Sequence, residues 1–113
     1  MNPLELAYKY MEISFSEKDL NLLKNILTND CKFVGPFYQF NSAQDYIDSL
    51  FQDPPINIKY EVIKTYQDDH SACLIYNFTK PGITTKMTQI FEVSENKISG
   101  IQLIFDTKPF SGS

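Results

Sequence analysis

ACLIYNFT (residues 72–79), TKMTQIFEV (85–93) and ISGIQLIF (98–105) decide the fold of this chain. These stretches are rich in β-branched and aromatic residues, and their side chains alternate with the period of two that β-strands show. Residues 56–64 alternate in the same way. The connections are short, at Lys80-Pro81-Gly82 and at residues 94–97. Consecutive strands with short turns form an antiparallel meander, so we predict an antiparallel sheet over the second half of the chain.

The first half of the chain has the apolar spacing of helices. We predict a helix over residues 3–15, a second helix that follows a capping-box pattern at residues 16–19 and carries Leu20, Leu23, Ile26 and Leu27, and a third over residues 43–51. Pro54-Pro55 ends the third helix, because proline lacks an amide proton and clashes with the preceding turn. A short strand is expected at residues 31–34. Helices followed by strands predict an α+β fold, with the helices packed on one face of the sheet.

Length and composition limit the domain organisation and the partners. The chain has 113 residues, which is ordinary for one domain, and we expect residues 1–107 to form it and residues 108–113 to be a loose tail. All ten basic residues are Lys, and the formal net charge is -4. A nucleic-acid-binding protein needs a concentrated basic face, so we expect no nucleic-acid partner.

The apolar segments and the cysteines bear on the cellular location that we expect. No segment approaches the roughly 18 apolar residues that span a bilayer, and we see no secretory signal. Cys31 and Cys73 are too few for a zinc site, which needs about four ligands. We therefore expect a cytoplasmic protein with reduced thiols, no membrane partner, no metal and no cofactor. A Cys31–Cys73 disulfide is the alternative.

Three stretches, taken in order, resemble the nuclear transport factor 2-like superfamily. Lys18-Asp19-Leu20-Asn21-Leu22-Leu23 is similar to the entry of the family's second helix. Asp30 to Pro36 is similar to its first strand, and Asn96 to Asp106 to its last hairpin. The resemblance covers roughly residues 4–107 and is nearest to the SnoaL-like polyketide cyclases and ketosteroid isomerases. It implies three N-terminal helices packed on a strongly curved antiparallel sheet, a cone-shaped, cystatin-like roll.

The same resemblance implies a pocket between the curved sheet and the first helix. Its lining would be Tyr10 with Phe33, Leu74, Tyr76, Phe78, Met87, Gln89, Phe91, Ile101, Leu103 and Phe105. The alternative is that these residues fill a closed core, as apolar residues at strand period usually do.

The isomerase machinery of the family is incomplete in this chain. The family's helix-one tyrosine, a donor to the enolate oxygen, falls on Tyr10. Its base falls near Val34-Gly35-Pro36, where no carboxylate is present, and its buried acid falls on about Gln89. An amide can donate a hydrogen bond but cannot act as a base. The resemblance therefore gives no ketosteroid isomerase, and the superfamily's Asp–Arg–Asp epoxide hydrolase relay is excluded because the chain has no Arg.

The cyclases suggest a different catalytic residue. They use an acid near the end of the last strand, which falls on Asp106 here, with Tyr10 or Tyr76 as donors. Strand alternation, however, places Asp106 on the face opposite Leu103 and Phe105, so capping of the turn at Thr107 and Lys108 is the preferred reading. His70 follows two acids in a predicted turn and is expected to be exposed, not a metal ligand.

Two kinds of function remain, together with one expectation about assembly. The first is the binding of a hydrophobic, cyclic or ketone-like small molecule without catalysis. The alternative is a cyclase or isomerase that uses Asp106 as general acid and base. A further alternative is a protein-interaction domain, and we expect a homodimer because the outer face of the sheet would be semi-apolar, with Cys73, Ile75, Asn77, Ile90, Gln102 and Ile104.

Overall fold

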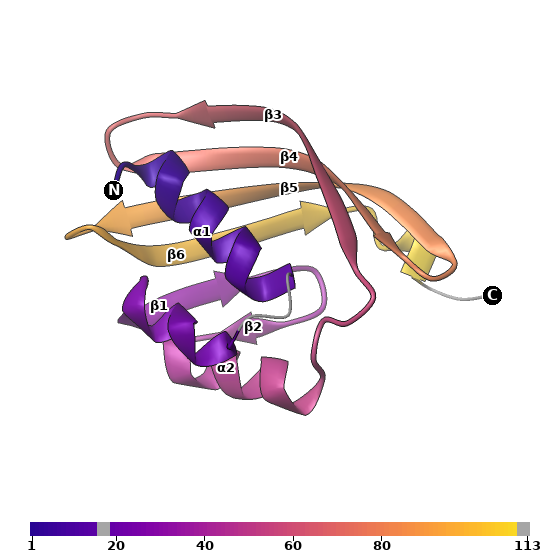
Figure 1. Cartoon of the computed structure of the whole chain (residues 1–113), viewed down its shortest axis with the longest axis horizontal. Helices are drawn as coiled ribbons and strands as arrows, with labels where there is room; N and C mark the ends of the chain where they lie inside the picture. The colour runs from indigo at the N-terminus through magenta and orange to yellow at the C-terminus, as the bar shows by residue number, and fades with distance from the viewer. Residues whose placement is uncertain (16–18, 111–113) are drawn as a thin grey trace.

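The computed structural model describes residues 1–15 and 19–110. Along the chain its elements are α1 (Pro3–Phe15), the 3-10 helix η1 (Leu20–Asn25), β1 (Leu27–Val34), β2 (Gln39–Phe40), α2 (Ala43–Gln52), β3 (Lys59–Gln67), β4 (Ser71–Lys80), β5 (Ile83–Ser94), β6 (Lys97–Phe105) and the 3-10 helix η2 (Lys108–Phe110) (Figure 1). The predicted α+β fold is confirmed. The capping box expected at residues 16–19 lies mostly outside the described residues.

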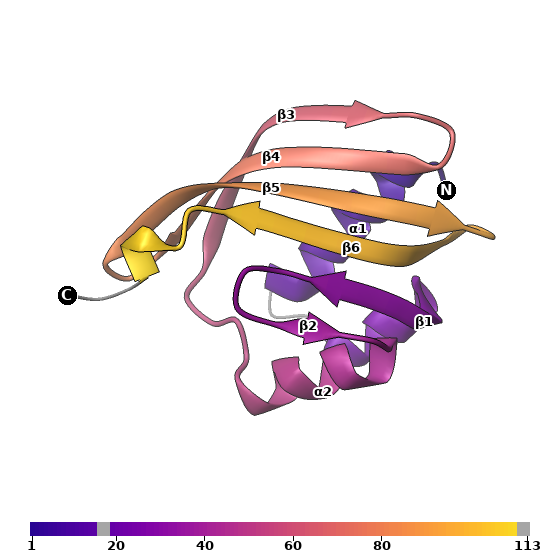
Figure 2. The ribbon, with the colours of Figure 1, turned by 180° about the vertical axis from the view of Figure 1, so that it is seen from behind.

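The strands form one six-stranded sheet in the order β2-β1-β6-β5-β4-β3. The meander from β3 to β6 is antiparallel, as predicted. The sheet as a whole is mixed and not purely antiparallel, because β1 pairs with β6 in parallel. Helix α1 crosses one face, which we call the inner face, and contacts β3 to β6. The opposite, outer face carries no other described element (Figure 2).

The register of β4 and β5 is unbroken from Ser71↔Glu92 to Lys80↔Ile83. Burial alternates residue by residue along β4, with Ala72, Leu74, Tyr76 and Phe78 buried. These inner-face side chains pack against α1, whose Leu6, Tyr10 and Met11 are also buried. The period of two therefore records which side of each strand faces the helices.

The expected second helix is shorter and tighter than predicted. It is a six-residue 3-10 helix that ends at Asn25, and Leu27 already belongs to β1. Ile26 O accepts a hydrogen bond from Ile98 N at 2.7 Å, and Leu27 pairs with Ile98 of β6. The edge of β6 thus takes up residues that helical spacing assigned to a helix, because tertiary pairing overrides local propensity.

The two α-helices have the caps that their sequences indicate. Ser42 Oγ accepts from Asp45 N at 3.1 Å and caps α2, as the pattern Ser42-Ala43-Gln44-Asp45 predicts. Asn2 Oδ1 accepts from Glu5 N at 2.8 Å, and Glu5 Oε1 accepts from Asn2 N, which closes a reciprocal capping box on α1. None of the helices among the described residues is long and apolar enough to cross a membrane.

The expected tail, residues 108–113, is described as far as Phe110. Residues 108–110 form η2, and the Phe110 ring packs edge-on against Phe105 and Phe37, with centroid distances of 5.1 and 5.9 Å. An aromatic ring at the end of a chain finds more apolar contact against other rings than in water. Both cysteines are free thiols, and burial raises the pKa of Cys31 to about 12.

Candidate functional site: an aromatic cavity

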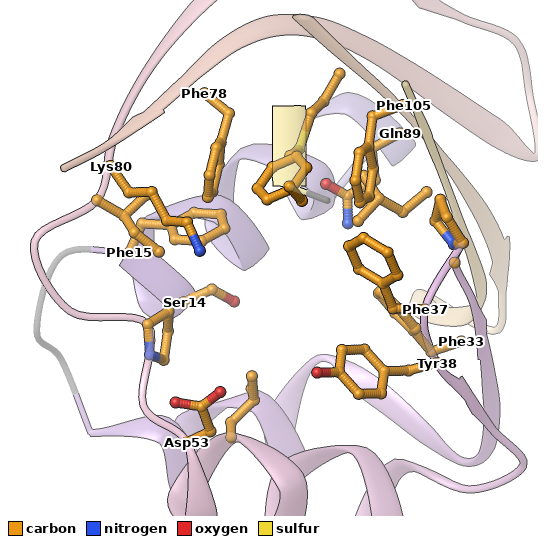
Figure 3. A pocket seen from close by; sticks show the side chains of 18 of the residues that line it. Ser14, Phe15, Phe33, Phe37, Tyr38, Asp53, Phe78, Lys80, Gln89 and Phe105 are labelled. Atoms are coloured by element: carbon orange, nitrogen blue, oxygen red, sulfur yellow. The ribbon is translucent and has the colours of Figure 1, made fainter. Parts of the chain in front are cut away.

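A cavity of about 720 Å³ lies between the inner face of the sheet, the end of α1 and α2 (Figure 3). Four of its buried lining residues, Tyr10, Tyr46, Tyr76 and Gln89, mark what we call the deep end. Its exposed lining residues, which include Phe37, Tyr38, Asp53 and Ile56, mark the mouth.

The deep end holds a cluster of buried hydroxyl and amide groups. The hydroxyls of Tyr10 and Tyr46 hydrogen-bond each other, and Tyr76 Oη donates to Gln89 Oε1 at 2.8 Å. The rings of Tyr46 and Phe33 stack at 4.7 Å. These polar tips lie among aromatic rings, as buried tyrosines require.

Burial keeps these phenols neutral. It raises the pKa of Tyr10 to about 12 and raises those of Tyr46 and Tyr76 well above the ordinary tyrosine value. Removing a group from water disfavours its charged form, and for a phenol that form is the anion. At neutral pH the deep end therefore carries protonated O–H groups that can donate hydrogen bonds but cannot accept a proton as a base.

Aromatic rings also make the walls nearer the mouth. Phe37 lies edge-on to Phe105 at 5.5 Å, and Phe15 lies edge-on to Phe78 at 6.4 Å. Residues 53–58, between α2 and β3, supply a further wall that contains Pro54-Pro55. Within this segment the backbone at Asn57 has a positive φ of 58°. Asparagine tolerates this left-handed conformation better than most residues.

Most of the residues expected to form a pocket do line the cavity. They are Tyr10, Phe33, Tyr76, Phe78, Met87, Gln89, Leu103 and Phe105. Leu74, Phe91 and Ile101 do not line it and lie in the closed core. The Phe91 ring lies edge-on to Tyr10 at 5.2 Å, so α1 already covers this part of the sheet. Strand alternation identifies the inner face, but it does not say how far along each strand the cavity extends.

Asp106 does not belong to the cavity. Its side chain is exposed, and its Oδ1 accepts a hydrogen bond from Lys108 N at 3.0 Å. This is the turn-capping position that strand alternation favoured, because neighbouring residues on a strand point to opposite faces. Asp106 therefore lies outside the cavity, and its expected role as a general acid and base stays a prediction.

Several cavity residues were not predicted from the sequence. Tyr46 lies on the apolar stripe of the predicted third helix, so its spacing gave a signal that it faces inward. Ser14, Asp53 and Lys80 gave none, because single polar residues at element ends are usually solvated. Among the lining residues described, Lys80 is the only basic side chain and Asp53 the only acidic one.

His70 lies in the β3–β4 turn and is exposed, as expected. Its backbone N–H donates to Asp68 Oδ1 at 2.8 Å, and this hydrogen bond lowers the pKa of the Asp68 carboxyl. Across residues 1–15 and 19–110, no three His, Cys, Asp or Glu side chains are grouped so that they could hold a metal ion.

Known structures of similar shape were found by comparison, whereas no protein-family model and no curated protein matches the chain. An NTF2-like protein of unknown function from Cytophaga hutchinsonii is 20% identical, with a TM-score of 0.85, over 99% of this chain and 96% of that one. A putative SnoaL-like polyketide cyclase from Jannaschia has 10% identity and a TM-score of 0.77, over 98% and 93% of the two chains. A putative ketosteroid isomerase from Kribbella flavida has 19% identity and a TM-score of 0.79, over 90% and 76%.

Proposed function

Because the chain has the nuclear transport factor 2-like fold, we propose that it binds a hydrophobic small molecule, cyclic or ketone-like, in its aromatic cavity. The observation that carries the proposal is the cavity itself, a space of about 720 Å³ lined by rings, with buried hydroxyl groups at one end. Small-molecule sites commonly have about 300–1,000 Å³ and combine an apolar lining with a few convergent polar groups. We also propose that this chain belongs with the SnoaL-like proteins within the superfamily.

The polar groups of the deep end favour a ligand with an oxygen at one end. Tyr10 and Tyr46 share one hydrogen bond, and the Gln89 side chain, whose amide N–H₂ is a donor, also lies close enough to Tyr10 to lower the pKa of that phenol. A carbonyl or ether oxygen placed there would accept hydrogen bonds from neutral donors. Ring stacking along Phe33 and Phe105 suits a flat or cyclic body.

Binding without catalysis is supported better than enolisation. Removing a proton beside a carbonyl needs a base of suitable pKa within hydrogen-bond reach of the substrate. The buried titratable groups that line the cavity are phenols with raised pKa values, and the carboxylate of Asp53 lies exposed at the mouth. These groups can hold an oxygen more readily than they can take a proton from carbon.

Native mass spectrometry with a neutral ring ketone, 2-decalone, tests this proposal. We expect one added 2-decalone per chain, and we expect the adduct to disappear when Leu103→Trp fills the cavity from β6. Gln102→Trp, at the exposed neighbouring position on the outer face, is the matched control and should keep the adduct. The proposal fails if the wild-type protein carries no adduct, or if Leu103→Trp binds as well as the control does.

We further infer that two copies of the chain pair through the outer face of the sheet. Side chains along this face are semi-apolar, and Ile104 and Tyr66 are 47% and 53% exposed. One row of paired residues crosses the sheet from β3 to β6, and it runs through Tyr66, Cys73, Ile90 and Gln102. Exposed apolar patches of this kind mark interaction sites. Sedimentation equilibrium should give twice the chain mass, and a single-chain mass at micromolar concentration would overturn the inference.

A further inference from the structure

Lys80 brings a positive charge to the cavity wall. It ends β4 and is half-buried, and its Nζ lies 5.2 Å from the centroid of the Phe110 ring. Figure 3 shows the side chain bent over the cavity with its nitrogen toward the open space. Within the described part of the chain, its ammonium group has no carboxylate partner. A cation–π contact positions this charge without neutralising it.

Ser14 brings an unused donor to the same cavity. Its side chain is 4% exposed, and its Oγ makes no hydrogen bond to any described residue, although it lies near enough to Tyr10 to lower the pKa of that phenol. In Figure 3 the Ser14 oxygen and the Lys80 nitrogen lie on the same side of the cavity and both face its open space. A buried hydroxyl without a partner is costly, roughly 1–3 kcal/mol, so this group is poised for a ligand acceptor.

We propose that the bound molecule carries a carboxylate, which Lys80 Nζ and Ser14 Oγ receive together. A carboxylate has two oxygens that only accept hydrogen bonds, whereas an ammonium and a serine hydroxyl both donate. The ring body of the same molecule then lies against Phe15 and Phe78 and extends toward Gln89. This inference rests on the proposed function and specifies its ligand class as an aromatic or alicyclic carboxylic acid.

Asp53 reinforces this orientation. It is the other charged residue of the lining and is exposed at the mouth, and in Figure 3 Ser14 lies between it and Lys80. A ligand carboxylate beside Asp53 would meet a like charge, whereas one beside Lys80 meets an opposite charge. The two charges therefore favour one placement of an anionic head over the other.

A pair of competitors with the same ring system, one with a charged and one with a neutral head group, tests the inference. The neutral dye N-phenyl-1-naphthylamine reports on the cavity by its fluorescence, and 2-naphthoate and 2-naphthamide displace it. We expect 2-naphthoate to bind about tenfold more tightly than 2-naphthamide, which corresponds to about 1.4 kcal/mol. Lys80→Gln should abolish this preference and leave the affinity for 2-naphthamide within about twofold. Ser14→Ala should reduce the preference several-fold.

Lys86→Gln is the matched control, because Lys86 is an exposed lysine on the outer face of β5 and does not line the cavity. It should keep the full preference for 2-naphthoate. In the wild-type protein the preference should also shrink as salt is raised, since salt screens charge pairs near the surface.

The outcomes separate this inference from the proposed function. If the dye and 2-naphthamide both fail to bind the wild-type protein, the proposed small-molecule function is wrong. If both bind but 2-naphthoate shows no preference, or keeps its preference in Lys80→Gln, the carboxylate inference is wrong and the binding function stands.

Discussion

The hydrogen bond between Tyr76 and Gln89 can be removed from either side, which tests how the deep end of the cavity is held together. Tyr76 Oη donates to Gln89 Oε1 at 2.8 Å, and the two side chains are 1% and 2% exposed. Gln89→Leu leaves the Tyr76 hydroxyl without this acceptor, and Tyr76→Phe leaves the amide oxygen without this donor. The double variant removes both groups.

The expected costs follow from burial. A buried polar group left without its partner costs about 1–3 kcal/mol, so we expect each single variant to lose about 2 kcal/mol of the free energy of unfolding. In a domain of this size that lowers Tm by about 8 °C, at about 4 °C per kcal/mol. The double variant replaces both partners with apolar side chains, so neither a donor nor an acceptor of this pair is left unpaired. Its loss in the free energy of unfolding should therefore be at least 1 kcal/mol smaller than the sum of the two single losses.

Urea unfolding followed by circular dichroism measures all four proteins. Gln102→Leu is the matched control, since it makes the same change at an exposed position of β6, and it should alter stability by no more than about 0.5 kcal/mol. Strictly additive losses in the double variant would refute the reasoning, because they would mean that Tyr76 and Gln89 do not act as a pair.

Four further predictions concern single features. Burial raises the pKa of Tyr10 above that of the unfolded chain, so the unfolded state releases its proton first, and this phenol alone should lower stability by roughly 2–3 kcal/mol between about pH 10 and pH 12. The raised pKa values of Tyr46 and Tyr76 act in the same direction, so urea titrations at several pH values should show at least this loss. Asp106→Asn should leave dye binding within about twofold of wild type, because the carboxylate lies outside the cavity; a tenfold loss would restore it to the site. Phe110→Ala should cost about 1–2 kcal/mol in thermal unfolding, less than a fully buried ring, and no loss would mean that η2 does not pack on the sheet. Ile104→Lys should shift sedimentation toward a single-chain mass, and an unchanged dimer would place the interface elsewhere.

The strand half of the fold was predictable because its signal is local. Residues 72–79 are a mostly apolar run between two turn sequences, and β4 and β5 pair without a slip. The third helix was predictable for the same reason, since Ser42 caps it and Pro54 follows its end. Patterns of period and capping survive tertiary packing when no other element competes for the same residues.

The parallel pairing of β1 with β6 could not be predicted from such patterns. Ile26 and Leu27 continue a helical spacing, but they pair with Ile98, more than seventy residues later. A local pattern contains no information about a partner so distant in sequence. The short strand β2, only Gln39–Phe40, is also set by its pairing with Phe33 and Val34 and not by its own period.

The residues of the candidate site were likewise predictable only where the signal is local. The inner-face residues of β4 and β5, such as Tyr76 and Gln89, follow from strand alternation together with the resemblance. Lys80, Ser14 and Asp53 join the cavity because element ends converge there, and nothing in their sequence neighbourhood marks them. Asp106 was suggested as a catalytic residue by its position near the end of the last strand, whereas strand alternation pointed it to the opposite face, and it lies outside the cavity.

The most direct test of whether the aromatic cavity binds a hydrophobic molecule is a fluorescence titration of N-phenyl-1-naphthylamine into the wild-type protein and its Leu103→Trp and Gln102→Trp variants. We expect saturable binding of one dye per chain in the wild type and in Gln102→Trp, and at least tenfold weaker binding when tryptophan fills the cavity at position 103. Equal binding by all three proteins would place the dye on the surface, and no saturable binding by the wild type would show that the cavity does not take hydrophobic molecules.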